Sequence, residues 1–166
     1  MASKTILHVS SILWNSEQEA AFVILNDAEG HGYALPVNYH DASKLIIGLR
    51  GDWGPQISAE VTIANLLKQF KARPIEVHIY AASQNEVFIH LVYSHGFAQS
   101  TLDLSPTDAF SFALRYTLPI TIPSNLWKAL CLSKSPSYQD SSKTSKFYLI
   151  TPPKPDLPKH PVYSVG

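Results

Sequence analysis

The sequence predicts a single α+β domain of mostly antiparallel strands with three or four short helices. Short apolar or alternating segments, separated by turn residues, fill much of the first hundred residues, as is typical of strands that pair through hairpins. Two stretches with apolar residues at helical spacing interrupt these strands, and a third begins at a helix-start signal, Ser105-Pro106. We therefore expect helices packed on a largely antiparallel sheet.

The N-terminal part is expected to form three strands and a helix. The strands span residues 5–13, 20–25 and 33–39, with a turn at 26–30. Asp41 is a favourable N-cap for the helix. Leu45, Ile46 and Leu49 form its apolar stripe, and Gly51 is suited to end it.

A loop at residues 52–57 separates this helix from a second one. Ser58 is the expected N-cap, and the helix runs to about Phe70. Ile63, Leu67 and Phe70 recur at helical spacing, so we expect all three to face the core.

A β-hairpin and a further strand are expected next. Residues 74–81 and 87–94 flank a short polar turn, and residues 98–104 continue the meander. His78 and His90 lie on adjacent strands of this hairpin, so the two imidazoles can form a cross-strand pair, although surface or packing roles are the ordinary ones for such residues.

The clearest local signal begins the third helix, residues 106–116. Ser105 is the N-cap, Pro106 occupies the first helical position, and Asp108 follows three residues after the cap, which is a capping-box arrangement. Its core face is Ala109, Phe112 and Ala113. A strand at 118–122 and a last helix complete the domain; Ser124 is the expected N-cap of that helix, which runs to about Leu130.

The composition changes at residue 133, so we expect a domain at 1–132 and a flexible tail at 133–166. The tail is rich in Ser, Lys and Pro, and repeated proline blocks regular strand pairing. The apolar segment 147–150 is the exception, because it can dock as an edge strand or act as a partner-binding peptide.

Composition and charge limit the class of protein. Hydrophobic residues make up 45% and charged residues 16% of the 166 residues, which fits one globular domain. No apolar run approaches the roughly 18 residues that span a membrane, and the single cysteine, Cys131, suits the reducing cytoplasm. Residues 1–127 hold seven Lys/Arg against eleven Asp/Glu, whereas residues 128–166 hold six Lys against two Asp. The core is therefore acidic and the tail basic.

Several segments resemble the bifunctional nuclease family. Residues 102–115, LDLSPTDAFSFALR, are similar to its signature D-x-R-P-S-D-A-I-x-L-A-L-R, and residues 118–120, LPI, are similar to the strand that follows it. Residues 34–37, ALPV, resemble its LPI strand, and the order of segments agrees over about residues 6–130. The resemblance implies an antiparallel-rich α+β domain, usually oligomeric, with nuclease activity on RNA and DNA.

The resemblance also implies a phosphodiester-cleaving site around the signature helix. Asp108, Glu60 and Asp103 would be its catalytic carboxylates, and Arg115 and Thr107 would contact the substrate. A magnesium or manganese ion held by carboxylates would assist cleavage. Structural roles stay open beside these, because acids at helix starts and cations at helix ends also stabilise the helix dipole.

Three positions depart from the family pattern. Ser105 stands where the family has arginine, Ser43 where it has glutamate, and residues 58–60, SAE, where it has T-H-D. One carboxylate, one imidazole and one cation are thereby absent from the pattern. A second hypothesis is therefore a catalytically inactive, homo-oligomeric binding or scaffolding module whose basic tail engages a protein partner.

Overall fold

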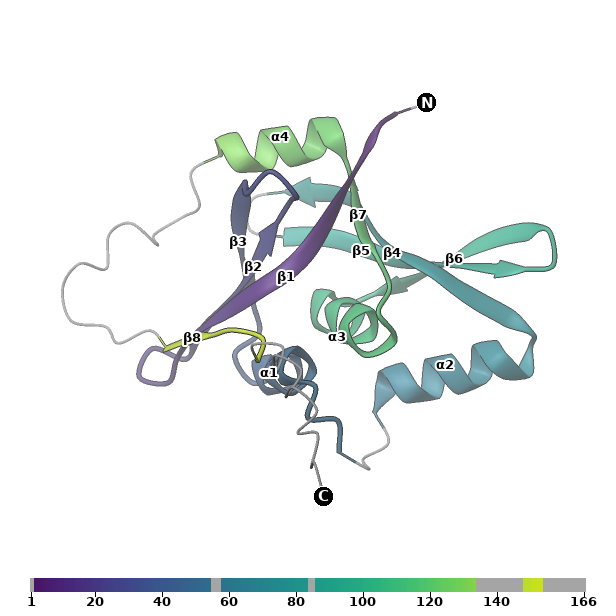
Figure 1. Ribbon diagram of the computed structural model, residues 1–166, viewed down its shortest axis with the longest axis horizontal. Helices are drawn as coiled ribbons and strands as arrows, with labels where there is room; N and C mark the ends of the chain where they lie inside the picture. The colour runs from purple at the N-terminus through teal and green to yellow at the C-terminus, as the bar shows by residue number, and fades with distance from the viewer. Residues whose placement is uncertain (1, 55–57, 84–85, 134–147, 154–166) are drawn as a thin grey trace, which may run out of the picture.

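The protein is described by a computed structural model that covers residues 2–54, 58–83, 86–133 and 148–153 (Figure 1). In chain order the elements are β1 (Lys4–Asn15), β2 (Ala20–Asn26), β3 (Gly32–Val37), α1 (Ala42–Arg50), α2 (Ala59–Gln69), β4 (Ala72–Ser83), β5 (Glu86–His95), β6 (Ala98–Leu104), α3 (Pro106–Tyr116), β7 (Ile120–Pro123), α4 (Ser124–Leu132) and β8 (Tyr148–Ile150). Each element expected from the sequence is present, with ends displaced by a few residues.

The described strands form one sheet in the order β3-β2-β1-β7-β4-β5-β6. Neighbouring strands are antiparallel except β4 and β7, which are parallel. β7 pairs with residues 4–7 of β1, and β8 pairs with residues 12–14 of the same strand. The predicted α+β domain of mostly antiparallel strands is therefore confirmed.

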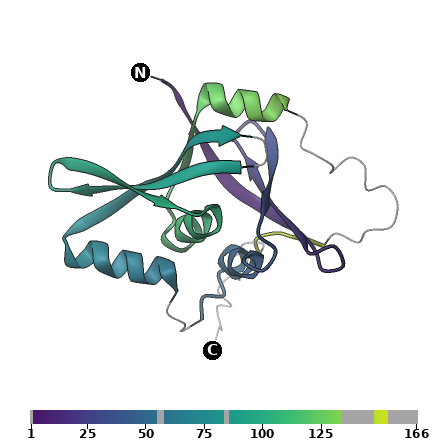
Figure 2. The same ribbon diagram turned by 180° about the vertical axis from the view of Figure 1, so that it is seen from behind.

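Three helices lie together on one side of the strands, and α4 lies at the opposite end of the molecule (Figures 1 and 2). α3 contacts β4, β5 and α1, and its residues Phe110 and Phe112 are fully buried. Ala109 and Ala113 are buried with them, so the predicted core face of this helix is confirmed.

The start of α3 has the N-cap that the sequence predicts, but the acid of the expected capping box accepts a bond from the Ser105 hydroxyl and not from its backbone N–H. The Oγ of Ser105 accepts a hydrogen bond from the Asp108 backbone N–H at 3.2 Å. The same hydroxyl donates to the Asp108 carboxylate at 2.9 Å. The aspartate is thus held at the helix start, where a negative charge is stabilised by the dipole.

Two local expectations are wrong. Phe70 is 69% exposed rather than buried, because α2 ends at Gln69 and the left-handed Lys71 (φ +54°) turns the chain into β4. Leu67 is buried and Ile63 half-buried, as expected. The N-cap of α4 is Pro123 and not Ser124, whose hydroxyl instead bonds Thr5 Oγ1 at 2.8 Å.

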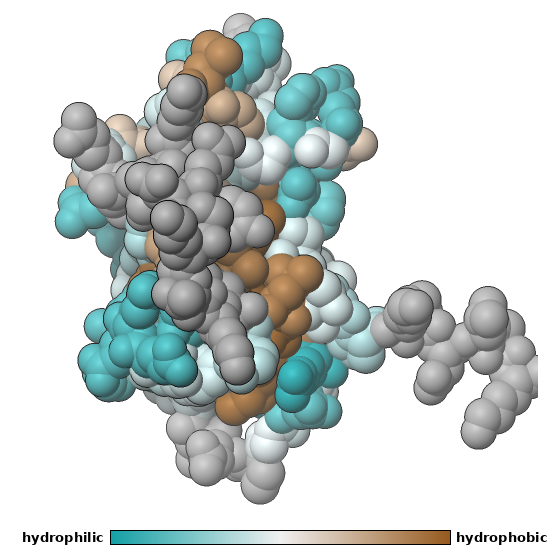
Figure 3. Space-filling view, turned by 90° about the vertical axis from the view of Figure 1, so that its left-hand side faces the viewer, coloured by the Kyte–Doolittle hydropathy of each residue, from teal (hydrophilic) through white to brown (hydrophobic). Residues whose placement is uncertain are grey.

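The predicted tail enters the described structure only in part. Residues 148–150 form β8 on β1, which is the strand alternative of the two open for this segment, whereas Phe147 and most of 133–166 lie outside the described residues. β8 lies on the side that Figure 3 turns toward the viewer, where apolar residues form a band between hydrophilic patches. Leu149 of β8 is 61% exposed.

No helix in the described ranges is a candidate for a membrane-spanning segment. None of α1 to α4 combines the length and the apolar character needed to cross a bilayer. The longest of them, α2 and α3, have eleven residues each.

Candidate active site

An open pocket of about 540 Å³ lies where β3, the β4–β5 hairpin and the junction of β6 with α3 meet. Its polar lining residues are Asn38, Asp41, Glu86, Asp103, Ser105 and Thr107. Three of these are carboxylates, and the described lining contains no Lys or Arg. The pocket therefore has a negative lining that would attract a cation.

Two predicted site residues enter this pocket from one junction. Asp103 lies near the end of the edge strand β6 and is exposed, and Thr107 lies in the first turn of α3 and is buried. Residues 35–37 of β3 form the facing part of the lining. Two of the segments that carry the family resemblance, residues 34–37 and 102–115, are far apart in the chain and thus meet at one cavity.

A row of rings leads along the β4–β5 hairpin to the pocket. The ring centroids of Phe88 and Tyr80 are 6.3 Å apart, those of Tyr80 and His90 are 4.7 Å apart and stacked, and those of His90 and His78 are 5.4 Å apart. Tyr80 and Phe88 also line the pocket and are exposed. The cross-strand histidine pair considered from the sequence is confirmed, because His78 and His90 are register partners.

Hydrogen bonds fix the far end of this row. His78 Nδ1 lies 2.8 Å from Thr121 Oγ1, and Thr121 donates to Glu76 Oε2 at 2.9 Å. Burial and the neighbouring Lys4 lower the pKa of His78, so its imidazole is neutral near pH 7. Burial alone would raise the pKa of Glu76, but hydrogen bonds from Lys4 and Thr121 lower it. The ring of His78 is therefore an uncharged, oriented surface.

His90 connects the row to the carboxylates. It is the register partner of Asp103 in the β5–β6 ladder, and directly opposed residues point to the same face of a sheet. Its imidazole and the Asp103 carboxylate therefore lie on one face beside the pocket.

Asp108 does not line the pocket. Its carboxylate accepts the Ser105 hydroxyl bond and lies 4.0 Å from Lys44 Nζ of α1. The side chain is 31% exposed. The structure thus gives Asp108 a helix-capping environment beside the pocket, and its catalytic role stays a prediction.

Glu60 and Arg115 form a separate pair between α2 and α3. Glu60 is only 3% exposed; its Oε1 accepts a bond from Ser111 Oγ at 3.2 Å and lies 3.9 Å from Arg115 Nη1. The Arg115 guanidinium lies 4.7 Å from the centroid of the Trp53 ring. Trp53 in turn packs against Gly48 of α1, where an added Cβ would approach the indole to 2.9 Å. These contacts tie α1, α2 and α3 together.

The five predicted residues therefore occupy three places. Asp103 and Thr107 share the pocket, Asp108 lies next to it on α3, and Glu60 and Arg115 are paired away from it. Asp41 is expected from the sequence only as a helix cap and Glu86 only beside a turn, yet both line the pocket. The ring row was not predicted, although the alternation of Tyr80 with the buried Ile79 places the tyrosine on the outer face.

The pocket's oxygen donors suit a hard divalent ion. No three carboxylate or imidazole ligand atoms lining it lie within 4.8 Å of one another in the described part of the chain. Magnesium is usually held by one or two carboxylates, with waters and substrate phosphates completing the shell. The donors thus fit an ion that binds together with a phosphate, not a pre-formed protein cage.

Comparison with known families agrees with this geometry. The family model described as "Bifunctional nuclease domain" matches residues 23–134, from β2 to just beyond α4. No curated protein matches the sequence. The matched range is more than half of the chain and contains every residue that lines the pocket. The chain belongs to the bifunctional nuclease domain family.

Proposed function

We propose that the protein is a metal-dependent nuclease that cleaves phosphodiester bonds of single-stranded RNA or DNA in the pocket at the β6–α3 junction. The observation that carries this proposal is the convergence of the two family-like segments on one open cavity with three carboxylates. Family membership supports a nuclease-type domain.

The charges of the pocket support a requirement for metal. A phosphodiester would be repelled by Asp41, Glu86 and Asp103, and no Lys or Arg of the described lining offsets them. Magnesium or manganese held by these carboxylates would neutralise the phosphate and acidify a bound water. His90, on the same face as Asp103, is the imidazole available for proton transfer.

The ring row supports a single-stranded substrate. Unpaired bases stack on aromatic side chains, which is favourable for every base and needs no sequence readout. Phe88 and Tyr80 are the exposed rings of the row that line the pocket, and His90 stacks behind Tyr80, so the first two rings are available to unpaired bases. A duplex keeps its bases stacked on each other and cannot use these rings.

The test is cleavage of labelled single- and double-stranded RNA and DNA with Mg²⁺, with Mn²⁺ and with chelator. An Asp41→Asn/Asp103→Asn double variant, purified in the same way, gives the background of contaminating nucleases. We expect chelator-sensitive cleavage by the unaltered protein, faster on single strands. Cleavage no higher than that of the folded double variant in all conditions would refute the proposal.

The ring row gives a second prediction. Stacking of one base on an aromatic side chain contributes about 1–3 kcal/mol, so Phe88→Ala should raise KM for a single-stranded substrate at least about five-fold with kcat little changed. The measurement is steady-state cleavage of a labelled oligonucleotide. Phe97→Ala is the matched control, since Phe97 is also exposed but does not line the pocket. An unchanged KM for Phe88→Ala would exclude stacking there.

A second candidate function is a non-catalytic, oligomeric binding module. The specific observation is an apolar groove of about 380 Å³ between α2 and β6. Leu66, Phe70 and Leu102 line it and are 48%, 69% and 40% exposed. Exposed apolar side chains gathered in one groove are typical of interaction surfaces. The basic tail stays the predicted segment for a further protein partner.

A single introduced charge tests whether copies of the protein associate through this groove. Phe70→Glu should shift the protein toward the monomer, because it places an unpaired charge in a desolvated contact. The measurement is size-exclusion chromatography with light scattering. Ile47→Glu on α1, also an exposed apolar residue, should leave the assembly unchanged. If the unaltered protein and both variants show the same ratio of monomer to oligomer, any contact between copies lies outside this groove.

A further inference from the structure

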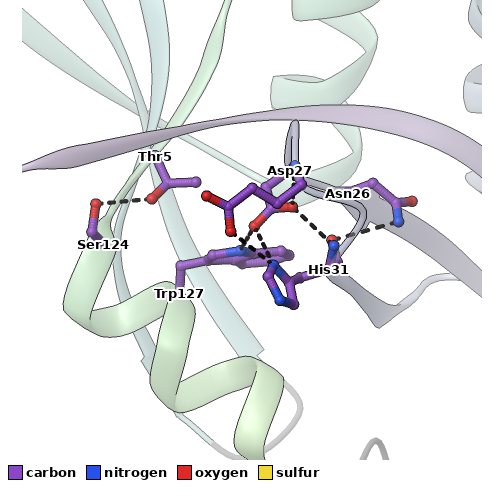
Figure 4. Close-up of polar contacts among 7 residues, drawn as sticks. Thr5, Asn26, Asp27, His31, Ser124 and Trp127 are labelled. Atoms are coloured by element: carbon purple, nitrogen blue, oxygen red, sulfur yellow. Dashed lines mark hydrogen bonds and ion pairs between the residues drawn. The ribbon is translucent and has the colours of Figure 1, made fainter.

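The ligand-type side chains of Asp27, Glu29 and His31 converge on the turn between β2 and β3. Figure 4 shows Asp27 and His31 pointing toward one another. His31 Nδ1 lies 3.1 Å from Asp27 Oδ2 and 3.6 Å from Glu29 Oε2. One ligand atom from each of the three side chains lies within 4.8 Å of the other two. This is the one such group of His, Cys, Asp and Glu side chains in the described residues.

The Asp27 carboxylate is fixed by groups around it. Its Oδ1 accepts the backbone N–H of Glu29 at 3.0 Å and that of His31 at 2.9 Å. Its Oδ2 accepts the indole N–H of Trp127 at 2.9 Å, from the distant helix α4. The carboxylate is therefore oriented before any ligand arrives.

The separations of His31 Nδ1 from the two carboxylates are close to those around one small cation. Zinc binds imidazole nitrogen and carboxylate oxygen at about 2.0–2.1 Å in tetrahedral geometry, which places neighbouring ligand atoms about 3.3 Å apart. The 3.1 Å contact is a hydrogen bond between His31 Nδ1 and Asp27 Oδ2, and the 3.6 Å contact joins His31 Nδ1 to Glu29 Oε2, so an ion could replace both contacts with little movement of these atoms. A mixed imidazole and carboxylate set is one that zinc-class ions accept. Outer hydrogen bonds to ligating carboxylates, as from Trp127, are a regular feature of metal sites.

Solvent reaches this group through an open groove of about 850 Å³. Asp27, Glu29 and His31 line it together with Trp127 and Cys131. The Cys131 thiol is not within the 4.8 Å group. A bound ion would thus keep a position facing the groove.

We propose that Asp27, Glu29 and His31 form a binding site for one divalent ion of the zinc class, with the fourth coordination position open to the groove. The site lies at the start of β3, whereas the nuclease pocket lies at its end, and the two share no residue. It does not depend on the proposed nuclease activity.

Binding at this site should stabilise the fold. Glu29 and His31 are 81% and 60% exposed, so without an ion they are held mainly by the turn. An ion would join both to Asp27, and through it to Trp127 and α4. Because the unfolded chain does not hold the three ligands in place, binding energy adds to folding stability.

The test uses metal-free protein dialysed from chelator, titrated with Zn²⁺ by calorimetry and with Co²⁺ by visible absorption. We expect one ion per chain, a tetrahedral Co²⁺ spectrum and a higher thermal midpoint with Zn²⁺. Glu29→Gln and His31→Ala should each weaken binding by at least about 10-fold, since even outer partners of metal ligands contribute that much. Both side chains are exposed, so these variants should remain folded.

Two control variants test whether ion binding depends on the three proposed ligands and not on other side chains. His95→Ala removes an exposed histidine of β5 and should bind the ions as the unaltered protein does. Cys131→Ser should also bind unchanged. The proposal is overturned if the unaltered protein takes up no stoichiometric ion, if Glu29→Gln and His31→Ala bind as it does, or if Cys131→Ser loses the ion.

Discussion

Asp103→Asn is expected to lower metal-dependent cleavage by about 100-fold or more without unfolding the protein. Asparagine keeps the size of the side chain but removes the charge that would hold the ion. A metal ion contributes several kcal/mol to the stabilisation of a phosphoryl transition state, and each 1.36 kcal/mol is ten-fold in rate. Asp103 is exposed on an edge strand, so its replacement should change the free energy of unfolding little. The measurement is kcat/KM on a single-stranded substrate with saturating Mg²⁺.

Two other aspartate variants complete this experiment. Asp108→Asn alters the other acid of the signature, which caps α3 and faces Lys44. Asp52→Asn alters an exposed acid outside the pocket and should leave the rate unchanged. If Asp108→Asn abolishes cleavage while Asp103→Asn does not, the pocket assignment is wrong and Asp108 is the catalytic acid.

The helices and strands could be predicted because their signals are local. Four consecutive residues, 105–108, predict the start of α3, and the Ser105 side chain caps the helix as expected. The exposed Phe70 was not predictable from spacing, because the end of α2 depends on the left-handed turn at Lys71. The parallel pairing of β4 and β7 also has no local signal, since it depends on how the chain returns after α3.

The candidate site was harder to predict than the fold. Asp41 precedes α1 and Glu86 begins β5, and they share a pocket with Asp103 only because β3 and β5 approach each other. The family signature includes the β6–α3 junction that lines the pocket, but it does not show which of its acids face the pocket. Glu60 shows the difference: its helix turns the carboxylate toward Ser111 and Arg115, and not toward Asp103. Residue type alone does not reveal that direction.

This arrangement predicts a structural role for Arg115, and its substitution should have a large effect on stability. Arg115→Met should reduce the free energy of unfolding by about 3 kcal/mol, because removing one partner of a buried ion pair leaves an uncompensated charge. Glu60 is 3% exposed and would lose its cation, whereas the methionine still packs beside Trp53. The value is at the low end of the range for buried pairs because the Arg115 side chain is itself 21% exposed. Urea unfolding measures the change.

A second substitution separates the buried charge from lost packing. Adding Glu60→Gln to Arg115→Met removes the unpaired carboxylate but leaves an acceptor for the Ser111 hydroxyl, so most of the lost stability should return. The double-mutant cycle then reports the coupling between the two side chains. In the opposite pattern, Arg115→Met unfolds at the same urea concentration as the unaltered protein but has a raised KM for nucleic acid. That result would make Arg115 the substrate contact that the family signature implies. Because Glu60 and Arg115 lie outside the pocket lining, the structure favours the first result.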